Sequence, residues 1–225
     1  MSEGHRDRIV AVAARLLAEG GREAVSTRAV SAAAGVQAPT IYRIFGDKQG
    51  LLDAVAEHGF AAYVGPKRTR RQSGDPVEDL RAGWDLHLEF GLANPAVYVL
   101  MTEPRPSGPP PAATAGIDYL TGLVQRIAEA GRLAVPVEQA VQLIHASGTG
   151  ATLTILGMAE DARDTTVSRL AREATINAIT TDAPVSTPGA AGAAVALRAA
   201  LPEVPGLSHP ERALLGEWLD RIASP

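Results

Sequence analysis

The sequence predicts an all-α protein. Helical periodicity recurs along nearly the whole chain, no stretch shows the strict alternation typical of a strand, and Gly- and Pro-rich breaks separate the periodic segments. Hydrophobic residues make up 46% and charged residues 20% of the 225 residues, so the chain can bury a core. We expect a three-helix domain over residues 1–48 and a larger helical domain over residues 49–225.

The first predicted helix covers residues 5–19. Its apolar residues recur at i, i+3, i+4, i+7 and i+8, the stripe of an amphipathic helix, and Gly20-Gly21 ends it. The residues of this stripe are Ile9, Val12, Ala13, Leu16 and Leu17.

Two short helices and one long helix follow. Ser26 is a typical N-cap residue, and Gly35 ends the second helix about two turns later. The third segment runs over residues 37–45, with Pro39 tolerated because it falls in the first turn. A longer amphipathic helix starts at Lys48.

The larger domain is predicted to be helical up to the C-terminal residues. A Pro-rich stretch, residues 104–111, is interpreted as a loop within this domain. The expected helices cover residues 76–93, 95–102, 112–130, 137–159, 164–180, 190–200 and 210–223.

Charge and composition exclude several classes. The net charge of −4 argues against a protein that coats nucleic acid through bulk charge, although residues 1–50 carry seven basic and five acidic residues. The chain has no cysteine, hence no disulfide or thiolate metal site. Charged residues near the N-terminus interrupt any signal-peptide core, so we expect a cytoplasmic protein.

One uncharged stretch is long enough to span a membrane. Residues 139–159 lack formal charge, but their Gln, His, Ser and Thr side chains would be costly in lipid. We interpret this stretch as a helix buried in protein and expect no membrane association.

Two short helices joined at Gly35 are typical of a helix-turn-helix, whose second helix enters the major groove of DNA. The same pattern is also found in plain helical hairpins. The flanking residues favour DNA binding, because helix N-termini and hydroxyl or ammonium groups bind phosphate while Gln and Arg read base edges. The phosphate-binding candidates are Ser26, Thr27, Tyr42 and Lys48, and the groove-facing candidates are Gln37, Ala38, Thr40 and Arg43.

Residues 25–52 resemble the DNA-binding signature of the tetracycline-repressor (TetR) family. The stretch reads VSTRAVSAAAGVQAPTIYRIFGDKQGLL, with the Thr-Arg opening, the Ala-Gly-Val turn, the Thr-Ile-Tyr core and a Lys before paired leucines. The resemblance implies that Tyr42 and Lys48 clamp phosphates and that Thr27 caps its helix. It places Arg28, Gln37, Ala38, Pro39, Thr40 and Arg43 along the groove. Ser31 stands where the family usually has Ala, and Ala38 is too short to hydrogen-bond a base.

The resemblance also implies that the larger domain binds a small molecule. A ligand site between helices is usually apolar with a few polar groups. Candidate lining residues are Trp84, His87, Phe90, Tyr98, Met101, Tyr119, Gln142, His145 and Thr149. Aromatic residues at helical spacing are also typical of an ordinary core, so this alternative stays open. No ligand spacing indicates a metal, and we expect neither a metal nor a cofactor.

Residues 137–159 and 164–180 are the best candidates for a homodimer interface. Small residues, Ala140, Ser147, Gly150, Ala151 and Thr154, give the first of these helices a face suited to close packing. Four helices across a two-fold axis would form a bundle. A monomer with a buried helix is the alternative.

We therefore expect a regulator of transcription and not an enzyme. Gly148-Thr149-Gly150 only weakly resembles a phosphate-binding loop, and the chain has neither a GxSxG elbow nor a cysteine nucleophile. The favoured function is a ligand-responsive repressor that binds a palindromic operator in double-stranded DNA as a dimer and is released by a lipophilic or neutral effector. The alternatives are a sequence-nonspecific DNA-binding protein without a ligand and, less favoured, a small helical enzyme.

Overall fold

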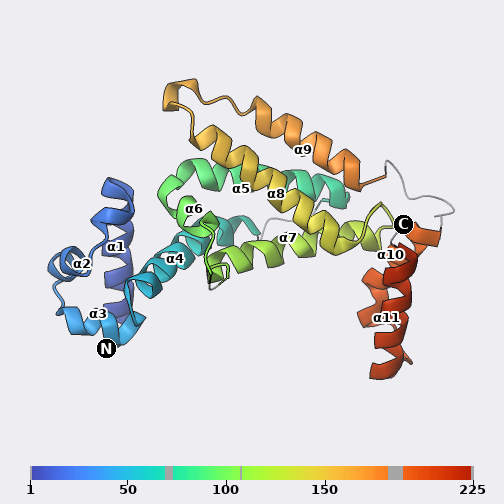
Figure 1. Cartoon of the computed structure of the whole chain (residues 1–225), viewed down its shortest axis with the longest axis horizontal. Helices are drawn as coiled ribbons and strands as arrows, with labels where there is room; N and C mark the ends of the chain where they lie inside the picture. The colour runs from blue at the N-terminus through green and yellow to red at the C-terminus, as the bar shows by residue number, and fades with distance from the viewer. Residues whose placement is uncertain (1, 69–72, 107, 182–189, 224–225) are drawn as a thin grey trace. The chain divides into compact units, whose positions relative to one another are not determined.

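The computed structural model describes residues 2–68, 73–106, 108–181 and 190–223. Within these ranges the fold is all-α, as the sequence predicts, with two short 3₁₀ turns (Figure 1). The helices are α1 (Ser2–Ala24), α2 (Thr27–Ala34), α3 (Ala38–Phe45), α4 (Lys48–Arg68), α5 (Pro76–Ala93), α6 (Pro95–Thr102), α7 (Pro111–Glu129), α8 (Val137–Leu156), α9 (Thr166–Ile179), α10 (Ala190–Ala200) and α11 (His209–Ala223).

Glycines set the boundaries of the first three helices. Gly20 and Gly21 leave helical geometry inside α1, and Gly21 has φ 66°, so the expected break is present as a kink. Gly35 ends α2 in the left-handed region at φ 63°, and its N–H donates to the carbonyl of Ser31. The predicted helix limits therefore hold to within a few residues.

The chain divides into two compact units. The first joins residues 1–70 to residues 89–116, so the end of α5, α6 and the following loop belong with the first four helices. Leu100 of α6 is buried in the same apolar core as α1 to α4. That core consists of Ile9, Val10, Ala13, Leu17, Val25, Val30, Ala34, Ile41, Leu51, Leu52, Ala54, Val55 and Leu100.

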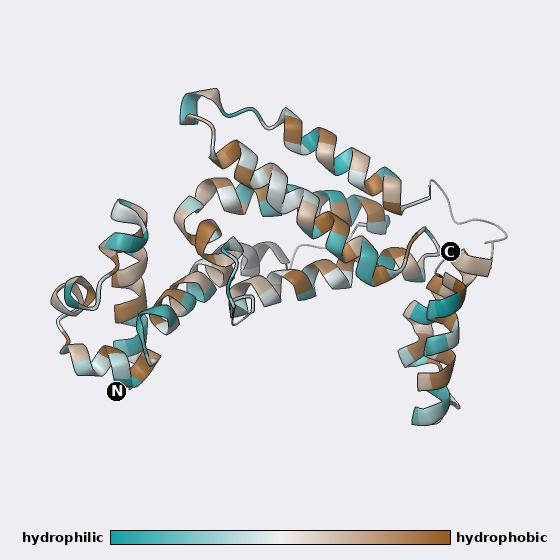
Figure 2. Cartoon of the chain, viewed as in Figure 1, coloured by the Kyte–Doolittle hydropathy of each residue, from teal (hydrophilic) through white to brown (hydrophobic). Residues whose placement is uncertain are grey.

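The second unit holds residues 71–88 and 117–225. Its α8 and α9 lie side by side, and α10 and α11 form a helical hairpin (Figure 1). Hydrophobic residues recur along each of these helices, and α8 carries them together with neutral polar residues (Figure 2). Among the described residues, no helix is long and apolar enough to cross a bilayer.

This grouping by compactness differs from the division expected at residue 48. The difference arises because α6 buries Leu100 against the first four helices, although about thirty residues of other structure separate it from α4 in the chain. The functional boundary at residue 48 stays a prediction.

Candidate nucleic-acid interface and ligand site

The N-terminus of α2 is fixed by its cap. The Ser26 hydroxyl accepts a hydrogen bond from the backbone N–H of Ala29 at 3.1 Å, and Val25 directly before it is fully buried. Ser26 is therefore the cap, and not Thr27 as the resemblance implied; Thr27 and Arg28 occupy the first turn of a helix whose free N–H groups suit a phosphate. Arg28 is exposed.

Ile41 anchors α3. It is buried in the core of the first unit, which directs the opposite side of this two-turn helix to solvent. The exposed residues are Gln37, Pro39, Tyr42 and Arg43, and Ala38 and Thr40 are half-buried beside them. The structure thus brings all six predicted DNA-contacting residues of this segment to one short helix and its N-cap.

Thr27 and Tyr42 meet across the two helices. Their hydroxyl oxygens lie 3.5 Å apart, and Tyr42 is 51% exposed. Two hydroxyls held at this distance can donate hydrogen bonds to neighbouring oxygens of one phosphate. This contact links the start of α2 to the middle of α3.

The start of α4 is fixed by a cap and a close backbone approach. The Asp47 carboxylate accepts the Gly50 N–H at 2.8 Å. A Cβ on Gly50 would overlap the carbonyl oxygen of Phe45, so only glycine fits between the end of α3 and the start of α4. Lys48, the first residue of α4, is thereby held close to the C-terminus of α3.

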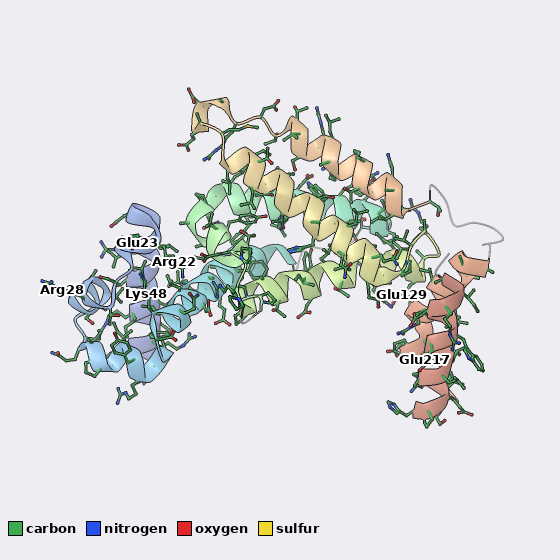
Figure 3. All side chains as sticks on the ribbon, viewed as in Figure 1. Arg22, Glu23, Arg28, Lys48, Glu129 and Glu217 are labelled. Atoms are coloured by element: carbon green, nitrogen blue, oxygen red, sulfur yellow. The ribbon has the colours of Figure 1, made fainter. Side chains whose placement is uncertain are left out.

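The interface is cationic. Arg28, Arg43 and Lys48 have no ion-pair partner within the described part of the chain, and Figure 3 shows Arg28 and Lys48 on the helices of this unit. Unpaired cations on a surface with free helix N–H groups attract a polyanion. Chemically, this surface can bind a phosphate backbone and present Gln37, Thr40 and Arg43 to base edges.

Sequence reasoning missed a polar network behind this surface. Arg22 at the end of α1 pairs with Glu103 and donates to Gln49 at 3.0 Å. Gln49 donates to Asp53 at 2.9 Å, and Asp53 pairs with Arg105, at 2.5 Å. The network ties the loop after α6 to α1 and α4, and no local sequence pattern indicates pairs about fifty to eighty residues apart.

Three of the predicted ligand residues lie in the first unit. Phe90 and Tyr98 are buried, and their rings lie 6.3 Å apart between centroids. Phe60 of α4 meets Phe90 edge-on at 5.6 Å, the arrangement of an aromatic core. Met101 is half-buried in α6.

The other candidates lie in the second unit. The Trp84 indole N–H donates to the buried Ser168 hydroxyl at 2.9 Å, which joins α5 to α9. A Cβ on Gly148 would lie 3.7 Å from the Trp84 ring and 3.8 Å from the His87 ring, so α5 and α8 approach closely here. Trp84 therefore has a structural role that aromatic spacing did not indicate.

Thr149 differs from its neighbours on α8. The hydroxyls of Thr152 and Thr154 donate to the carbonyls of Gly148 and Gly150, at 2.9 and 2.8 Å. The Thr149 hydroxyl is buried and finds no hydrogen-bond partner among the described residues. A buried polar atom without a partner is destabilising unless a bound molecule supplies one.

Burial lowers the pKa of both histidines on this side of the unit. Burial, together with the charge of His145, lowers the pKa of His87 to about 4, so His87 is neutral at pH 7. His145 and Gln142 are exposed on α8, and Tyr119 of α7 is half-buried. The structure thus places Trp84 and His87 in the second unit's interior beside the buried Thr149 hydroxyl, with His145 near enough for its charge to act on His87, and leaves Gln142 exposed. No group of three His, Asp or Glu side chains in the described ranges could hold a metal ion.

Comparison with known proteins agrees with the DNA-binding geometry. Residues 9–55 match the family described as bacterial regulatory proteins, tetR family. No curated protein matches the sequence.

Solved structures share the fold over most of the chain. A putative tetR family transcription regulator from Shewanella sp. PV-4 aligns at a TM-score of 0.59 and 20% identity, covering 79% of this chain and 98% of that one. The fatty acid degradation regulator FadR from Bacillus halodurans gives 0.59 and 20%, over 76% and 94%. A TetR variant from Acinetobacter baumannii AYE, solved in complex with minocycline, gives 0.55 and 19%, over 76% and 93%. The likeness to these structures shows the fold.

Proposed function

We propose that this chain, whose residues 9–55 match the family described as bacterial regulatory proteins, tetR family, is a dimeric repressor that a small neutral effector releases from a palindromic operator. The observation that carries the proposal is the Thr27–Tyr42 hydroxyl pair on a surface that also presents Arg28, Arg43 and Lys48. Such a surface holds the phosphate backbone and sets the orientation of α3 in the major groove.

The roles of the predicted DNA residues follow from their positions. Ser26, Thr27, Tyr42 and Lys48 lie at helix starts or beside the hydroxyl pair, where phosphate is bound. Arg28, Gln37, Thr40 and Arg43 project from α2 and α3 and carry the donors that read base edges, whereas Ala38 and Pro39 offer apolar contact to a thymine methyl.

An apolar face on α8 and α9 supports the proposed homodimer. Leu143, Leu153, Val167 and Leu170 are exposed there, Leu170 to 64%. Exposed apolar surface on two packed helices is typical of a subunit interface, and two copies would form a four-helix bundle. Ala140 and Ala151, which we expected to face the partner, are buried in the chain's own core, so the proposed interface uses the leucines instead.

The buried side of α8 is the proposed effector site of the second unit. Neutral His87, the Trp84 ring and the Thr149 hydroxyl, unpartnered within the described ranges, give an apolar surface with one hydrogen-bonding group to satisfy. This chemistry favours an uncharged, largely apolar molecule with a single hydrogen-bonding group near Thr149. Effector binding would shift the population toward a dimer whose recognition helices no longer fit half-sites one or more helical turns apart, at about 34 to 36 Å per turn.

DNA binding is tested by fluorescence anisotropy. A duplex selected from a randomised pool and the unselected pool are compared at two salt concentrations, with Tyr42→Ala as the control variant. We expect the selected duplex to bind about 10³-fold more tightly than the pool. Equal affinities with a steep salt dependence would instead indicate a nonspecific DNA-binding protein.

Base reading is tested separately with Arg43→Ala. This change should lower the preference for the selected duplex, because Arg43 is proposed to contact a base edge. An equal loss of affinity for both duplexes would assign Arg43 to phosphate binding.

The effector site is tested with an apolar fluorescent probe, N-phenyl-1-naphthylamine. Thr149→Val keeps the shape of the side chain and removes its hydroxyl, so it should improve binding of this weakly polar probe or leave it unchanged, while Gly148→Leu should block it. Probe binding unaffected by Gly148→Leu would place the site elsewhere.

A further inference from the structure

The last helix, α11, begins at a well-formed cap. The Glu211 carboxylate accepts hydrogen bonds from the backbone N–H of Ser208 at 2.8 Å and from its hydroxyl at 2.6 Å. This is the Ser-x-x-Glu arrangement of a helix start, and these bonds lower the pKa of Glu211. The helix therefore has a defined start and orientation.

This helix has two apolar sides. One side packs on α10, where Leu219 and Ala223 are buried and the Arg198 guanidinium lies over Gly216. The other side carries Leu214, Trp218 and Ile222, which are 46%, 50% and 50% exposed. We call these three residues the α11 stripe; their spacing of four places them along one side of the helix.

The charges beside the α11 stripe have a fixed order. Glu217 and Arg221 lie on the same flank of the helix, with their carboxylate and guanidinium 3.8 Å apart, and both are exposed. Figure 3 shows Glu217 on the hairpin. Asp220 is turned to the other side, where it pairs with Arg198 at 2.9 Å.

We propose that the α11 stripe pairs with the α11 stripe of a second copy, antiparallel about a two-fold axis. In an antiparallel pair each flank meets the same flank of the other helix. A two-fold axis at the level of Leu219 then sets Glu217 of each copy against Arg221 of the other, twice, and brings the two Trp218 rings together at the centre.

Charge order excludes the parallel arrangement. A parallel pair would set the Glu217 and Arg221 flank against the flank of Leu215, which has no charged residue at the level of Glu217 and Arg221; Glu211, seven residues before Trp218, lies in line with the stripe and is bonded to Ser208. The mixed charges also disfavour a lipid surface, because an interfacial helix needs an excess of Lys and Arg beside its apolar face. A second copy of the same helix, placed antiparallel, therefore covers the apolar stripe and sets Glu217 and Arg221 against residues of opposite charge.

The expected association is weak. One pair of 15-residue helices is smaller than a standard interface, so we expect the association to reverse on dilution. The contact is independent of the apolar face on α8 and α9. If that face forms a dimer, pairing through α11 joins two dimers; if it does not, pairing through α11 joins two monomers.

Sedimentation velocity over about 1 to 300 µM protein tests the pairing, because a weak interface forms only at the higher concentrations. Variants that reverse one or both flanking charges identify the contact. Glu217→Arg and Arg221→Glu each set like charges against each other twice, so each should weaken the mass-doubling step about tenfold or more. The double variant Glu217→Arg/Arg221→Glu restores opposite charges and should return to within about threefold of wild type. Glu203→Arg, an exposed change of the same charge off the stripe, should have no effect.

Trp218 supplies a second measurement. The chain has two tryptophans, and Trp84 is buried, so iodide should quench mainly Trp218 and should do so less as protein concentration rises. Wild-type protein of constant mass over the whole range, or a double variant as weak as the single variants, would overturn the pairing. Leu214→Glu, a stripe variant, should leave the dimer formed through α8 and α9 intact. Loss of that dimer in Leu214→Glu would also overturn the pairing, because the stripe would then be part of the α8 and α9 interface. Leu170→Glu, which should disrupt only the face on α8 and α9, keeps the two interfaces distinguishable.

Discussion

Tyr42 on α3 and Trp218 on α11 are half-exposed aromatic residues on short helices, yet their surroundings differ completely. Tyr42 lies against the Thr27 hydroxyl on a cationic surface, whereas Trp218 lies between Leu214 and Ile222. The first environment suits a polyanion and the second an apolar helix. The exposure of an aromatic ring therefore does not indicate which partner it binds. The charge and polarity of the residues around the ring indicate the partner.

The largest expected effect comes from a substitution that disturbs the backbone next to Tyr42, at the junction of α3 and α4. Gly50→Ala places a methyl group against the Phe45 carbonyl, so the junction of α3 and α4 must shift at a cost of about 3 kcal/mol. Urea denaturation should show this loss, together with loss of DNA binding. Gly122→Ala is the matched control, because nothing described lies within 4 Å of the added atom, and it should stabilise by about 0.5 to 1 kcal/mol.

Acid should weaken the second unit through His87. The pKa of His87 is about 4 in the folded protein and near 6.5 when unfolded, so the unfolded state binds more protons between these values. Stability is therefore complete above pH 6.5 and falls by about 2 to 3 kcal/mol as pH drops to 4. His87→Gln should remove this part of the pH dependence in thermal unfolding scans. Parallel curves for variant and wild type would contradict the assignment.

The third prediction compares the effects of Tyr42→Phe and Trp218→Phe on DNA binding. Tyr42→Phe removes only the hydroxyl and should weaken binding to every duplex by about 1 to 1.5 kcal/mol, close to tenfold. Trp218→Phe should leave anisotropy titrations at low protein concentration unchanged. A Trp218 variant that binds DNA as poorly as Tyr42→Phe would show that the two surfaces are not independent.

The smallest effect compares two helix caps. Ser26→Ala removes the acceptor for the Ala29 N–H and should cost about 1 kcal/mol of stability together with some DNA affinity. Ser208→Ala removes a hydroxyl bond to Glu211 and should weaken mass doubling without changing DNA affinity. Differential scanning calorimetry measures the stability of both variants. Anisotropy then shows whether the cap of α2 supports DNA binding, and sedimentation shows whether the cap of α11 supports pairing with a second copy.

Local signals in the sequence were sufficient for the helices and for grouping the candidate DNA-contacting residues on α2, α3 and the start of α4. The Ser26 cap and the Gly35 turn act over three or four residues, so they can be identified without the fold. Gln142 and His145 of α8 were expected to line a ligand site; Gln142 is exposed, whereas His145, although exposed in area, lies close enough to His87 to lower its pKa. That helix is nearly free of charge, so periodicity could not show which side is buried.

Long-range pairing was beyond the reach of the sequence. Arg105 lies in a Pro-rich loop and pairs with Asp53, and Trp84 donates to Ser168. Such pairs depend on how helices are brought together, and no local spacing encodes them. The antiparallel order of Glu217 and Arg221 became interpretable only once the exposed side of α11 was known.

The burial of Leu100 with the first four helices has a practical consequence for protein engineering. A fragment ending near residue 70 would lack Leu100 and the half-buried Ala96 and Val97 that pack on this core. The uncovered apolar surface on α1 and α4 would then face water and favour aggregation. The first four helices therefore do not form a unit that can be moved alone, and a chimaera that uses the proposed DNA-binding surface must carry residues 89–116 as well.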